Sequence, residues 1–149
     1  MQNVEALFAA YRDEVYRLAV SYTRNIQEAE DVCQTVFLKL MEQKSIRPGR
    51  EKAWLMQVTA NQCRSLLRSG WWKKTVPLEE SAFAATGETG TVLQEVLRLP
   101  PKYRVVIFLH YYEGWSTEEI GSLLKISRTA VTTRLARARD VLKTNLKEV

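Results

Sequence analysis

The residues of this sequence that are best suited to chemistry lie in its last third, where hydroxyl and guanidinium groups recur at helical spacing. They are Thr129, Thr133 and Arg137 on one side of an expected helix, with Arg128 and Thr132 beside them. Arginine presents a fork of donors, and both residue types can bond to base edges or to phosphate oxygens. The pattern favours a surface that reads DNA, and its simpler alternative is an ordinary solvated helix face.

The segment before that helix carries the signals of a helix-turn-helix. Ser116 followed by Glu119 is a capping-box pattern, which predicts the start of a helix between them. Gly121 leaves room where the two helices of such a motif approach each other. Residues 125–127 are the expected turn. Lys125 stands where glycine is usual, because the backbone there tends to need a positive φ, and a larger residue costs on the order of 1 kcal/mol.

Apolar residues at intervals of three and four give both helices of this motif a buried side. These residues are Ile120, Leu123 and Leu124 in the first helix and Val131, Leu135, Ala138 and Leu142 in the second. Ser127 is the expected N-cap of the second helix. The cap, the small residue and the turn spacing together favour a helix-turn-helix that enters the major groove over a plain surface helix.

The same periodicity predicts helices through most of the remaining chain, over about residues 4–22, 27–43, 51–68, 91–98 and 102–112. Proline pairs with glycine at 48–49 and with proline at 100–101, which separates neighbouring helices. Sustained alternation of apolar and polar residues, the mark of a strand, occurs in no window of five residues. The sequence therefore predicts an all-α fold.

We expect two small helical domains, residues 1–74 and 91–149, joined by a flexible acidic linker over residues 75–90. The second is a four-helix domain that contains the helix-turn-helix. Basic and acidic side chains number 12 and 8 over residues 1–75, none and 4 over 76–96, and 10 and 5 over 97–149. Two basic bodies on either side of an acidic connector suit a protein that brings both bodies to nucleic acid.

The helix over residues 27–43 is expected to bury one stripe, formed by Ala29, Val32, Cys33, Val36, Phe37, Leu40 and Met41. Its outer side is polar and mostly acidic except for one leucine, and consists of Glu30, Asp31, Gln34, Thr35, Leu38 and Glu42. Single exposed leucines are common, so Leu38 alone is a weak sign of a docking surface.

The helix over residues 51–68 carries amides and arginines in one line, namely Gln57, Asn61, Arg64 and Arg68. Its expected inner side is formed by Trp54, Leu55, Val58, Gln62 and Leu66. The loop over residues 44–50 adds Arg47 and Arg50. Such a strip could bind nucleic acid, and a solvated polar face explains it equally well.

Composition argues against several classes of protein. The 149 residues are 46% hydrophobic and 26% charged, which is typical of a globular chain. No apolar run approaches the roughly 20 residues of a membrane span, and the start does not resemble a secretion signal, so we expect a cytoplasmic protein. Cys33 and Cys63 are expected to be buried free thiols, and the only histidine, His110, a structural residue.

A catalytic function finds no support in the motifs. The chain has no glycine-rich phosphate loop, no metal-ligand constellation and no nucleophile paired with a base. We therefore expect no cofactor, no bound metal, no small-molecule substrate and no reaction of the protein's own.

Together these features resemble the extracytoplasmic-function sigma factors, the smallest bacterial sigma subunits, which consist of regions 2 and 4 alone. The stretch from Glu30 to Leu38 is similar to the part of region 2 that grips the clamp helices of the polymerase β′ subunit. Trp54-Leu55 followed by Asn61 resembles the region 2 helix that meets the minus-ten promoter element. Region 4 is matched by Leu99-Pro100, Tyr103-Arg104, Tyr112-Glu113-Gly114, Glu118-Glu119-Ile120, Ile126-Ser127, Val131, Arg134-Leu135 and Arg137-Ala138-Arg139.

The resemblance implies a specificity subunit that binds core RNA polymerase through the β′ clamp helices and the β flap, and that binds promoter DNA. It implies polymerase contacts at Glu30, Asp31, Gln34, Thr35, Leu38 and Glu42. It implies minus-ten contacts at Arg47, Arg50, Gln57, Asn61, Arg64 and Arg68, and minus-thirty-five contacts at Arg128, Thr129, Thr132, Thr133 and Arg137. An anti-sigma factor, which could hold the protein at the inner face of the membrane, is a further expected partner.

The main alternative is a free-standing helix-turn-helix repressor or activator that never contacts polymerase. Such a protein would account for residues 100–149. It would leave the first domain without a role.

Overall fold

The computed structural model describes residues 3–43, 45–69 and 91–147, and within these ranges the secondary structure is helical, with no β-strand. The all-α prediction is confirmed. The chain divides into two compact units, residues 1–77 and 78–149. The predicted linker, residues 75–90, lies outside the described residues. None of the described helices is both long and apolar enough to cross a membrane.

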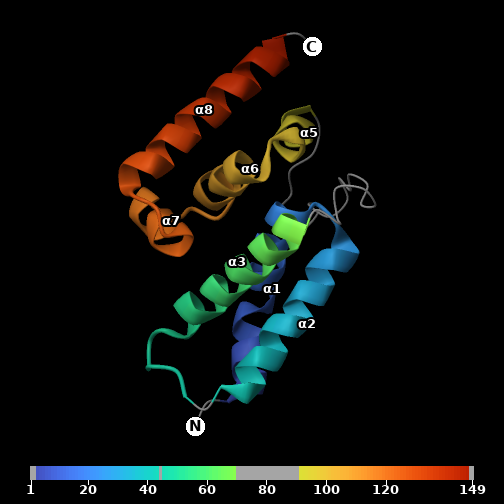
Figure 1. Ribbon diagram of the computed structural model, residues 1–149, viewed down its shortest axis with the longest axis vertical. Helices are drawn as coiled ribbons and strands as arrows, with labels where there is room; N and C mark the ends of the chain where they lie inside the picture. Colours follow the sequence, from blue (N-terminus) through green and yellow to red (C-terminus); the bar gives the residue numbers. More distant parts are fainter. Residues whose placement is uncertain (1–2, 44, 70–90, 148–149) are drawn as a thin grey trace. The chain divides into compact units, whose positions relative to one another are not determined.

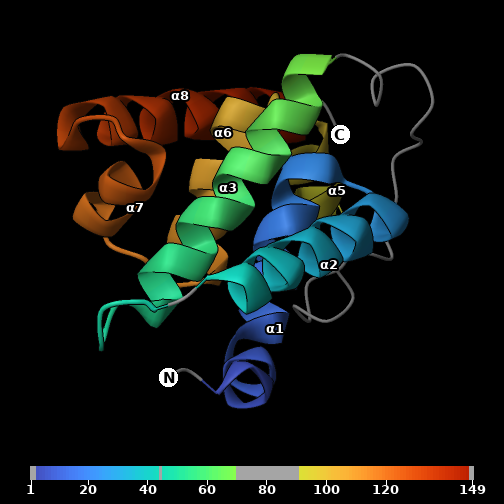
Figure 2. The ribbon, with the colours of Figure 1, turned by 60° about the horizontal axis from the view of Figure 1, so that its bottom comes forward.

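In its described residues, unit 1 consists of three helices that pack against one another: α1 (Val4–Thr23), α2 (Ile26–Glu42) and α3 (Glu51–Ser69) (Figures 1 and 2). An asparagine caps each of the first two helices. The side-chain oxygen of Asn3 accepts the N–H of Ala6 at 3.1 Å, and that of Asn25 accepts the N–H of Glu28 at 2.8 Å. The short corner between them lets α1 and α2 pack as an antiparallel pair, against which α3 lies.

The buried side of α3 differs from the prediction. Its buried residues are Leu55, Met56, Thr59, Ala60 and Cys63, whereas Trp54, Val58, Gln62 and Leu66 are only half-buried. The prediction of the inner side was therefore wrong except at Leu55. Because α3 packs against both α1 and α2, small side chains fit the closest approach. The hydroxyl of Thr59 is satisfied by donating to the carbonyl of Leu55 at 2.7 Å.

The predicted core stripe of α2 is confirmed at five positions, because Ala29, Val32, Val36, Phe37 and Leu40 are buried. It was wrong for Met41, whose side chain is 65% exposed. Met41 lies three residues after Leu38, so the two share the outer side of the helix. Met41 lies at the edge of the stripe, where the spacing of apolar residues does not distinguish a buried position from an exposed one.

The described part of unit 2 comprises α5 (Thr91–Arg98), α6 (Pro101–Ile107), a π-helical turn η2 (Phe108–Tyr112), α7 (Thr117–Leu124) and α8 (Arg128–Lys147). The helix predicted over 102–112 starts one residue earlier, since Pro101 takes the first helical position. It ends in a π-turn, where the N–H of Glu113 donates to the carbonyl of Phe108 at 3.1 Å. The predicted 91–98 helix is confirmed.

The core of unit 2 lies between α8 and the shorter helices. On α8 the predicted stripe is buried at Val131, Leu135 and Ala138, and it is half-buried at Leu142. It faces α5, α6 and α7, whose buried apolar residues include Leu93, Leu97, Val105, Val106, Ile120 and Leu123. The 20-residue helix α8 is thus the element against which the shorter helices of the unit pack.

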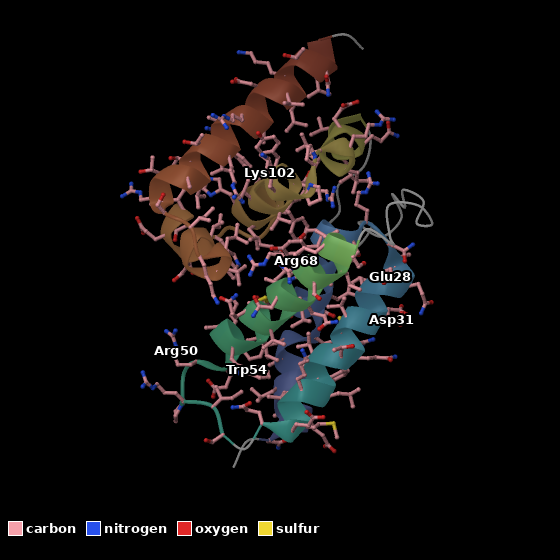
Figure 3. All side chains as sticks on the ribbon, viewed as in Figure 1. Glu28, Asp31, Arg50, Trp54, Arg68 and Lys102 are labelled. Carbon is pink, nitrogen blue, oxygen red and sulfur yellow. The ribbon has the colours of Figure 1, made fainter. Side chains whose placement is uncertain are left out.

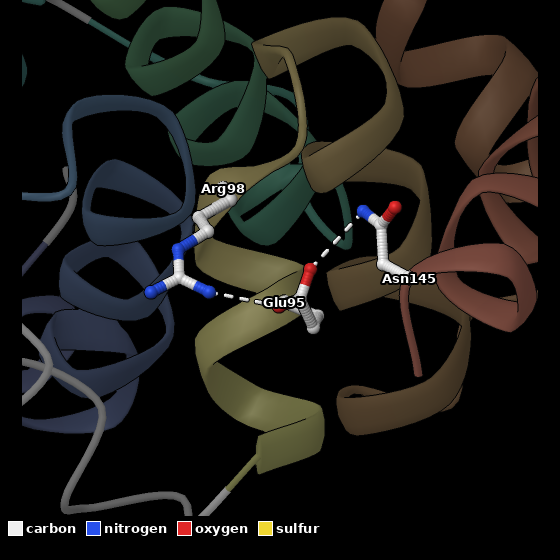
Figure 4. A network of polar contacts seen from close by, with 3 residues as sticks. All are labelled: Glu95, Arg98 and Asn145. Carbon is white, nitrogen blue, oxygen red and sulfur yellow. Dashed lines mark hydrogen bonds and ion pairs between the residues drawn. The ribbon is translucent and has the colours of Figure 1, made fainter. Parts of the chain in front are cut away.

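Among the described residues of this unit, two charged side chains are buried in the core. Arg104 is 1% exposed, and its Nη1 donates to the carbonyl of Leu99 at 2.7 Å, which ties the start of α6 to the chain before it. Glu95, 7% exposed, accepts from Arg98 Nη1 at 2.8 Å and from Asn145 Nδ2 at 3.1 Å (Figure 4). The second contact joins α5 to the last turns of α8.

Candidate functional site

The helix-turn-helix begins with the capping box predicted from the sequence. The N–H of Glu119 donates to Ser116 Oγ at 3.1 Å, and the N–H of Ser116 donates to a carboxylate oxygen of Glu119 at 2.9 Å. Both contacts satisfy N–H groups that the first turn of a helix leaves unpaired. The prediction of this helix start is confirmed, and the box fixes the direction in which α7 leaves the preceding loop.

The turn between α7 and α8 is held close by Gly121. A Cβ at this position would lie 2.8 Å from the carbonyl oxygen of Ile126. The N–H of Ile126 donates to the carbonyl of Gly121 at 3.0 Å, which holds the two backbones together. Lys125 ends α7 with φ of 60°, the left-handed conformation that the sequence required there. Both predictions about the turn are confirmed.

The outer face of α8 presents the predicted residues to solvent. Ser127 caps the helix, accepting the N–H of Ala130 at 3.0 Å. The exposed residues are Arg128, Thr129, Thr132, Thr133 and Arg137. Thr132 already donates its hydroxyl to the carbonyl of Thr129 at 2.9 Å, whereas Arg128 lies 3.5 Å from Glu118 in an ion pair whose members are about 70% exposed. Such a pair contributes little, so the guanidinium can exchange it for an anion.

A groove of about 450 Å³ runs between this face and the start of α6. Its lining includes Thr129, Thr133, Arg134 and Arg137 from α8 and Lys102 and Tyr103 from α6. Sequence reasoning did not assign Lys102 or Tyr103 to the site, because they are distant in the sequence and only the packing of α6 on α8 brings them there. Among the described residues that line the groove, the charged ones are all cations.

Three residues of the amide and arginine strip of α3, Gln57, Asn61 and Arg64, are joined by hydrogen bonds. Asn61 Oδ1 accepts from Gln57 Nε2 at 3.1 Å and from Arg64 Nη2 at 2.9 Å. Arg68 is exposed at the carboxyl end of the helix, while Trp54 lies near its start (Figure 3). Gln57 and Arg64 are half-buried and Asn61 is exposed. The strip lies opposite the buried side of α3, with half-buried Trp54 at its edge.

The loop before α3 places both of its predicted arginines in solvent. Arg47 and Arg50 are exposed, and the N–H of Arg50 donates to the carbonyl of Arg47 at 3.0 Å, which closes a tight turn. Gly49 in this turn has φ of 83°, a conformation that favours glycine. The carbonyl of Arg50 in turn accepts the N–H of Trp54 at 2.9 Å, so the loop is fixed to the first turn of α3.

The outer side of α2 combines acids with two exposed apolar side chains. Glu30, Asp31, Gln34 and Glu42 are exposed, and Thr35 is half-buried with its hydroxyl donating to the carbonyl of Asp31 at 3.0 Å. Leu38 is 58% exposed, as predicted, and the neighbouring Met41 extends the apolar surface beyond what the sequence suggested. Toward the start of α2, Glu28 and Asp31 lie on successive turns (Figure 3).

Charge is concentrated at the start of α2. Partial burial raises the pKa of Glu28, and the nearby carboxylate of Asp31 raises it further. Gln27 Nε2 donates to Asp31 Oδ1 at 3.2 Å. The outer side of α2 is therefore an acidic surface interrupted by Leu38 and Met41, which matches a partner that offers basic and apolar groups together.

Both cysteines are free thiols, with Cys63 buried and Cys33 half-buried. Burial raises the pKa of Cys33 to about 11, with Arg12 lowering it and Glu30 raising it to smaller degrees, and burial raises the pKa of Cys63 as well. The prediction of a buried thiol is confirmed for Cys63 and wrong for Cys33, which borders solvent. His110 is half-buried, and its Nδ1 donates to the carbonyl of Trp115 at 2.9 Å, since a carbonyl can only accept.

Alkylation should reveal these thiol environments. At pH 7 we expect Cys33 to react with iodoacetamide about two orders of magnitude more slowly than an ordinary thiol, because so little thiolate is present. The rate should rise with pH toward about 11. Mass spectrometry of timed samples measures it, and Cys33→Ser identifies the site. Rapid labelling of Cys33 at pH 7 would contradict the burial seen here.

Comparison with known proteins places both units in one family. The model of sigma-70 region 2 matches residues 7–73, and that of sigma-70 region 4 matches residues 90–142. The chain is 29% identical to the ECF RNA polymerase sigma factor SigW of Bacillus subtilis, over 93% of this chain and 86% of that one. It is 31% identical to the RNA polymerase sigma factor CarQ of Myxococcus xanthus, over 97% and 90%.

Two solved structures share the fold of this chain. The sigma factor RpoE of Bartonella quintana, crystallised with the anti-sigma factor NepR, has the same fold with a TM-score of 0.73, at 19% identity over 96% of each chain. CnrH, solved with the cytosolic domain of CnrY, gives 0.68 at 26% identity, over 97% of this chain and 88% of that one. The matched family models and the curated relatives are those of sigma factors, which are specificity subunits of RNA polymerase and not enzymes. The chain belongs to the extracytoplasmic-function sigma factors and acts in transcription initiation.

Proposed function

We propose that this sigma factor recognises the minus-thirty-five element with α8 and the minus-ten element with α3 and the loop before it, while α2 docks on core polymerase. Under this proposal residues 1–74 bind polymerase and the minus-ten element, residues 75–90 connect, and residues 91–149 bind the minus-thirty-five element. The observation that carries it is the capped helix-turn-helix, whose second helix exposes donors on the side opposite its buried stripe.

Recognition of the upstream duplex rests on the order of groups along α8. Arg128 and Thr129 lie in its first turn, where a recognition helix usually meets base edges. Thr132 and Thr133 follow one turn later, and Arg137 one turn after that. Since Thr132 is bonded to its own helix, we assign the strongest base contacts to Arg128 and Arg137, whose forks match guanine.

Recognition of the downstream element rests on the strip of α3. Asn61 is held by Gln57 and Arg64, so its amide is oriented before any ligand arrives. Arg47, Arg50 and Arg68 add exposed cations around the strip. Positive charge joined to oriented polar groups and a nearby aromatic ring suits a single strand, and Trp54 supplies that ring.

Binding to core polymerase is assigned to the outer side of α2. Leu38 and Met41 are exposed by more than half. Acids and polar groups surround them, namely Glu30, Asp31, Gln34, Thr35 and Glu42. The β′ clamp helices are the proposed partner of this surface, and the β flap that of unit 2. An apolar centre with a charged rim is the usual anatomy of a protein interface.

An anti-sigma factor is the remaining proposed partner. It is supported by two relatives of the same fold, RpoE and CnrH, which were solved with NepR and with the cytosolic domain of CnrY. An inhibitor that covers the outer side of α2 would block polymerase directly. Co-expression with the product of a neighbouring gene, followed by co-purification, tests this assignment.

Reconstituted transcription tests the proposal as a whole. Holoenzyme made from this protein and the source organism's core polymerase should initiate on total genomic DNA at defined start sites. Sequencing the transcript 5′ ends should then reveal two shared sequence blocks upstream. Core polymerase without the protein is the control. A free-standing repressor would bind DNA and give no new start sites, and that result would overturn the proposal.

Replacing Arg137 by alanine should weaken promoter binding by about 1–3 kcal/mol and relax the preference at one position of the upstream block, because a bidentate base contact is lost. Selection from a randomised duplex library measures both effects. Arg139→Ala is the matched control: Arg139 lies on the same helix and donates to the hydroxyl of Tyr111. An unchanged preference in Arg137→Ala would make Arg137 a phosphate contact.

A further inference from the structure

We propose that Glu118 of α7 is a specificity-determining residue: its carboxylate positions the guanidinium of Arg128 for a base and disfavours its binding to phosphates of unrelated sequences. Arg128 Nη1 and Glu118 Oε1 form an ion pair at 3.5 Å. This inference rests on the proposed function, in which Arg128 contacts a base edge of the upstream duplex. It adds to that contact a residue of the first helix of the helix-turn-helix.

The pair depends on the close approach of α7 and α8. Glu118 lies three residues before Gly121, so the two positions share one side of α7. A Cβ on Gly121 would lie 3.7 Å from the backbone nitrogen of Arg128, which places the start of α8 against that side. The N–H of Ile126 donates to the carbonyl of Gly121 at 3.0 Å and fixes this approach. The backbones of Glu118 and Arg128 are therefore held at a set separation.

The two acids in the first turn of α7 have different tasks. The carboxylate of Glu119 accepts the N–H of Ser116 at 2.9 Å and belongs to the capping box. The side chain of Glu118 extends to Arg128 instead. The first turn of α8 has no acidic residue of its own, so the negative partner of Arg128 comes from α7.

The chemistry of the pair allows Arg128 to hold a base and Glu118 at once. A guanidinium carries five N–H donors in a planar fork, and a guanine edge takes two of them through O6 and N7. The remaining donors can stay on the carboxylate, which then fixes the plane of the fork. Both side chains are about 70% exposed, so water screens the pair in the free protein. A base edge that displaces this water strengthens the pair.

The same carboxylate disfavours a phosphate at this position. A phosphate beside Arg128 would also lie near the negative charge of Glu118, and like charges at short range repel each other. The ion pair has no net charge, so it adds little to the attraction that binds DNA of any sequence. Glu118 thus lowers the affinity for unrelated sequences and raises it for the cognate one, and both effects widen the ratio between the two affinities.

Glu118→Gln tests both effects, because it keeps the length of the side chain and removes its charge. The probes are a duplex selected by the wild-type holoenzyme from a randomised library and a scrambled duplex of equal length, each bound to reconstituted holoenzyme. Affinity for the scrambled duplex should rise about two- to fivefold, and its slope of log affinity against log salt should steepen by up to about 0.9, the value for one added phosphate contact. Affinity for the selected duplex should fall about two- to fivefold, with a weaker preference at one base pair.

Asp140→Asn is the matched control, since Asp140 is exposed on α8 and its replacement changes the charge of unit 2 by the same amount. This variant should raise the affinity for both duplexes alike, because it alters only the general attraction to DNA. Equal shifts for both duplexes in Glu118→Gln, or a wild-type ratio between them, would overturn the inference.

A double-mutant cycle tests whether Glu118 acts through Arg128. In an Arg128→Ala background, Glu118→Gln should leave the ratio between the two duplexes unchanged, because the partner is missing. A changed ratio in that background would overturn the inference. Thermal unfolding of Glu118→Gln should match that of the wild type, since both members of the pair are exposed.

The failure of this inference can be told apart from that of the proposed function. If Arg128→Ala alters the selected sequence while Glu118→Gln behaves as the wild type, α8 reads DNA and only the role of Glu118 is wrong. If the wild-type holoenzyme selects no upstream sequence, both assignments fail together.

Discussion

Replacing Gly121 by alanine should destabilise the helix-turn-helix by about 1–3 kcal/mol, the usual cost of forcing extra atoms into a packed site. In a helix this substitution ordinarily stabilises, by up to about 1 kcal/mol. The sign reverses here because the new methyl group would lie 2.8 Å from the carbonyl oxygen of Ile126, a backbone atom that no rotamer change can move. The turn would have to open, and α8 would tilt relative to α7.

Hydrogen exchange measures this effect where it occurs. The amides of α7 and of the first turns of α8 should lose protection in Gly121→Ala, and binding to the selected duplex should fall with them. Ser122→Ala is the matched control, because Ser122 is the next residue of α7 and is exposed. It should leave protection unchanged or slightly higher. Greater protection in Gly121→Ala than in the wild type would show that the turn has room.

Replacing Leu38 by aspartate should weaken binding to core polymerase by about ten- to a hundredfold, the range expected when a central apolar contact of an interface is lost. The side chain is 58% exposed, so the substitution removes little from the core. It adds a charge to an outer side that is already acidic. Met41→Asp should act in the same direction, since Met41 is 65% exposed beside it.

Titration of labelled protein with core polymerase measures the affinity. Ala10→Asp is the control: it adds the same charge at an exposed position of α1 in the same unit. The circular dichroism of all variants should agree, and isolated DNA binding through α8 should be retained in Leu38→Asp. Loss of DNA binding together with polymerase binding would indicate a folding defect and contradict the docking assignment.

The sequence was most informative where a local rule determines the backbone. A capping box depends on two residues in one turn, so Ser116 and Glu119 could be paired without knowledge of the fold. The left-handed Lys125 and the close approach at Gly121 follow from the geometry of one short turn. Each of these features is decided within a few residues, and each was predicted correctly.

Predictions failed where the packing of distant segments decides burial. Periodicity gives α3 several possible inner faces, and the true one contains Thr59 and Ala60 because two helices press against it. Thr59 is a polar residue that the sequence would place at the surface, but its hydroxyl can be buried because it donates to the carbonyl of Leu55. Lys102 could not be assigned to the α8 groove for the same reason: nothing local to either segment records that α6 packs there.

The contact between Glu95 and Asn145 bears on how a fragment of this protein should be cut. The region 4 match ends at residue 142, yet Asn145, three positions later, accounts for one of the two bonds to a carboxylate that is only 7% exposed. Shortening the chain to the matched boundary would leave that carboxylate oxygen facing a gap, where solvent would enter beside α5. A fragment that keeps the final turns of α8 retains the hydrogen bond between Asn145 and Glu95, which connects the two ends of this helical unit.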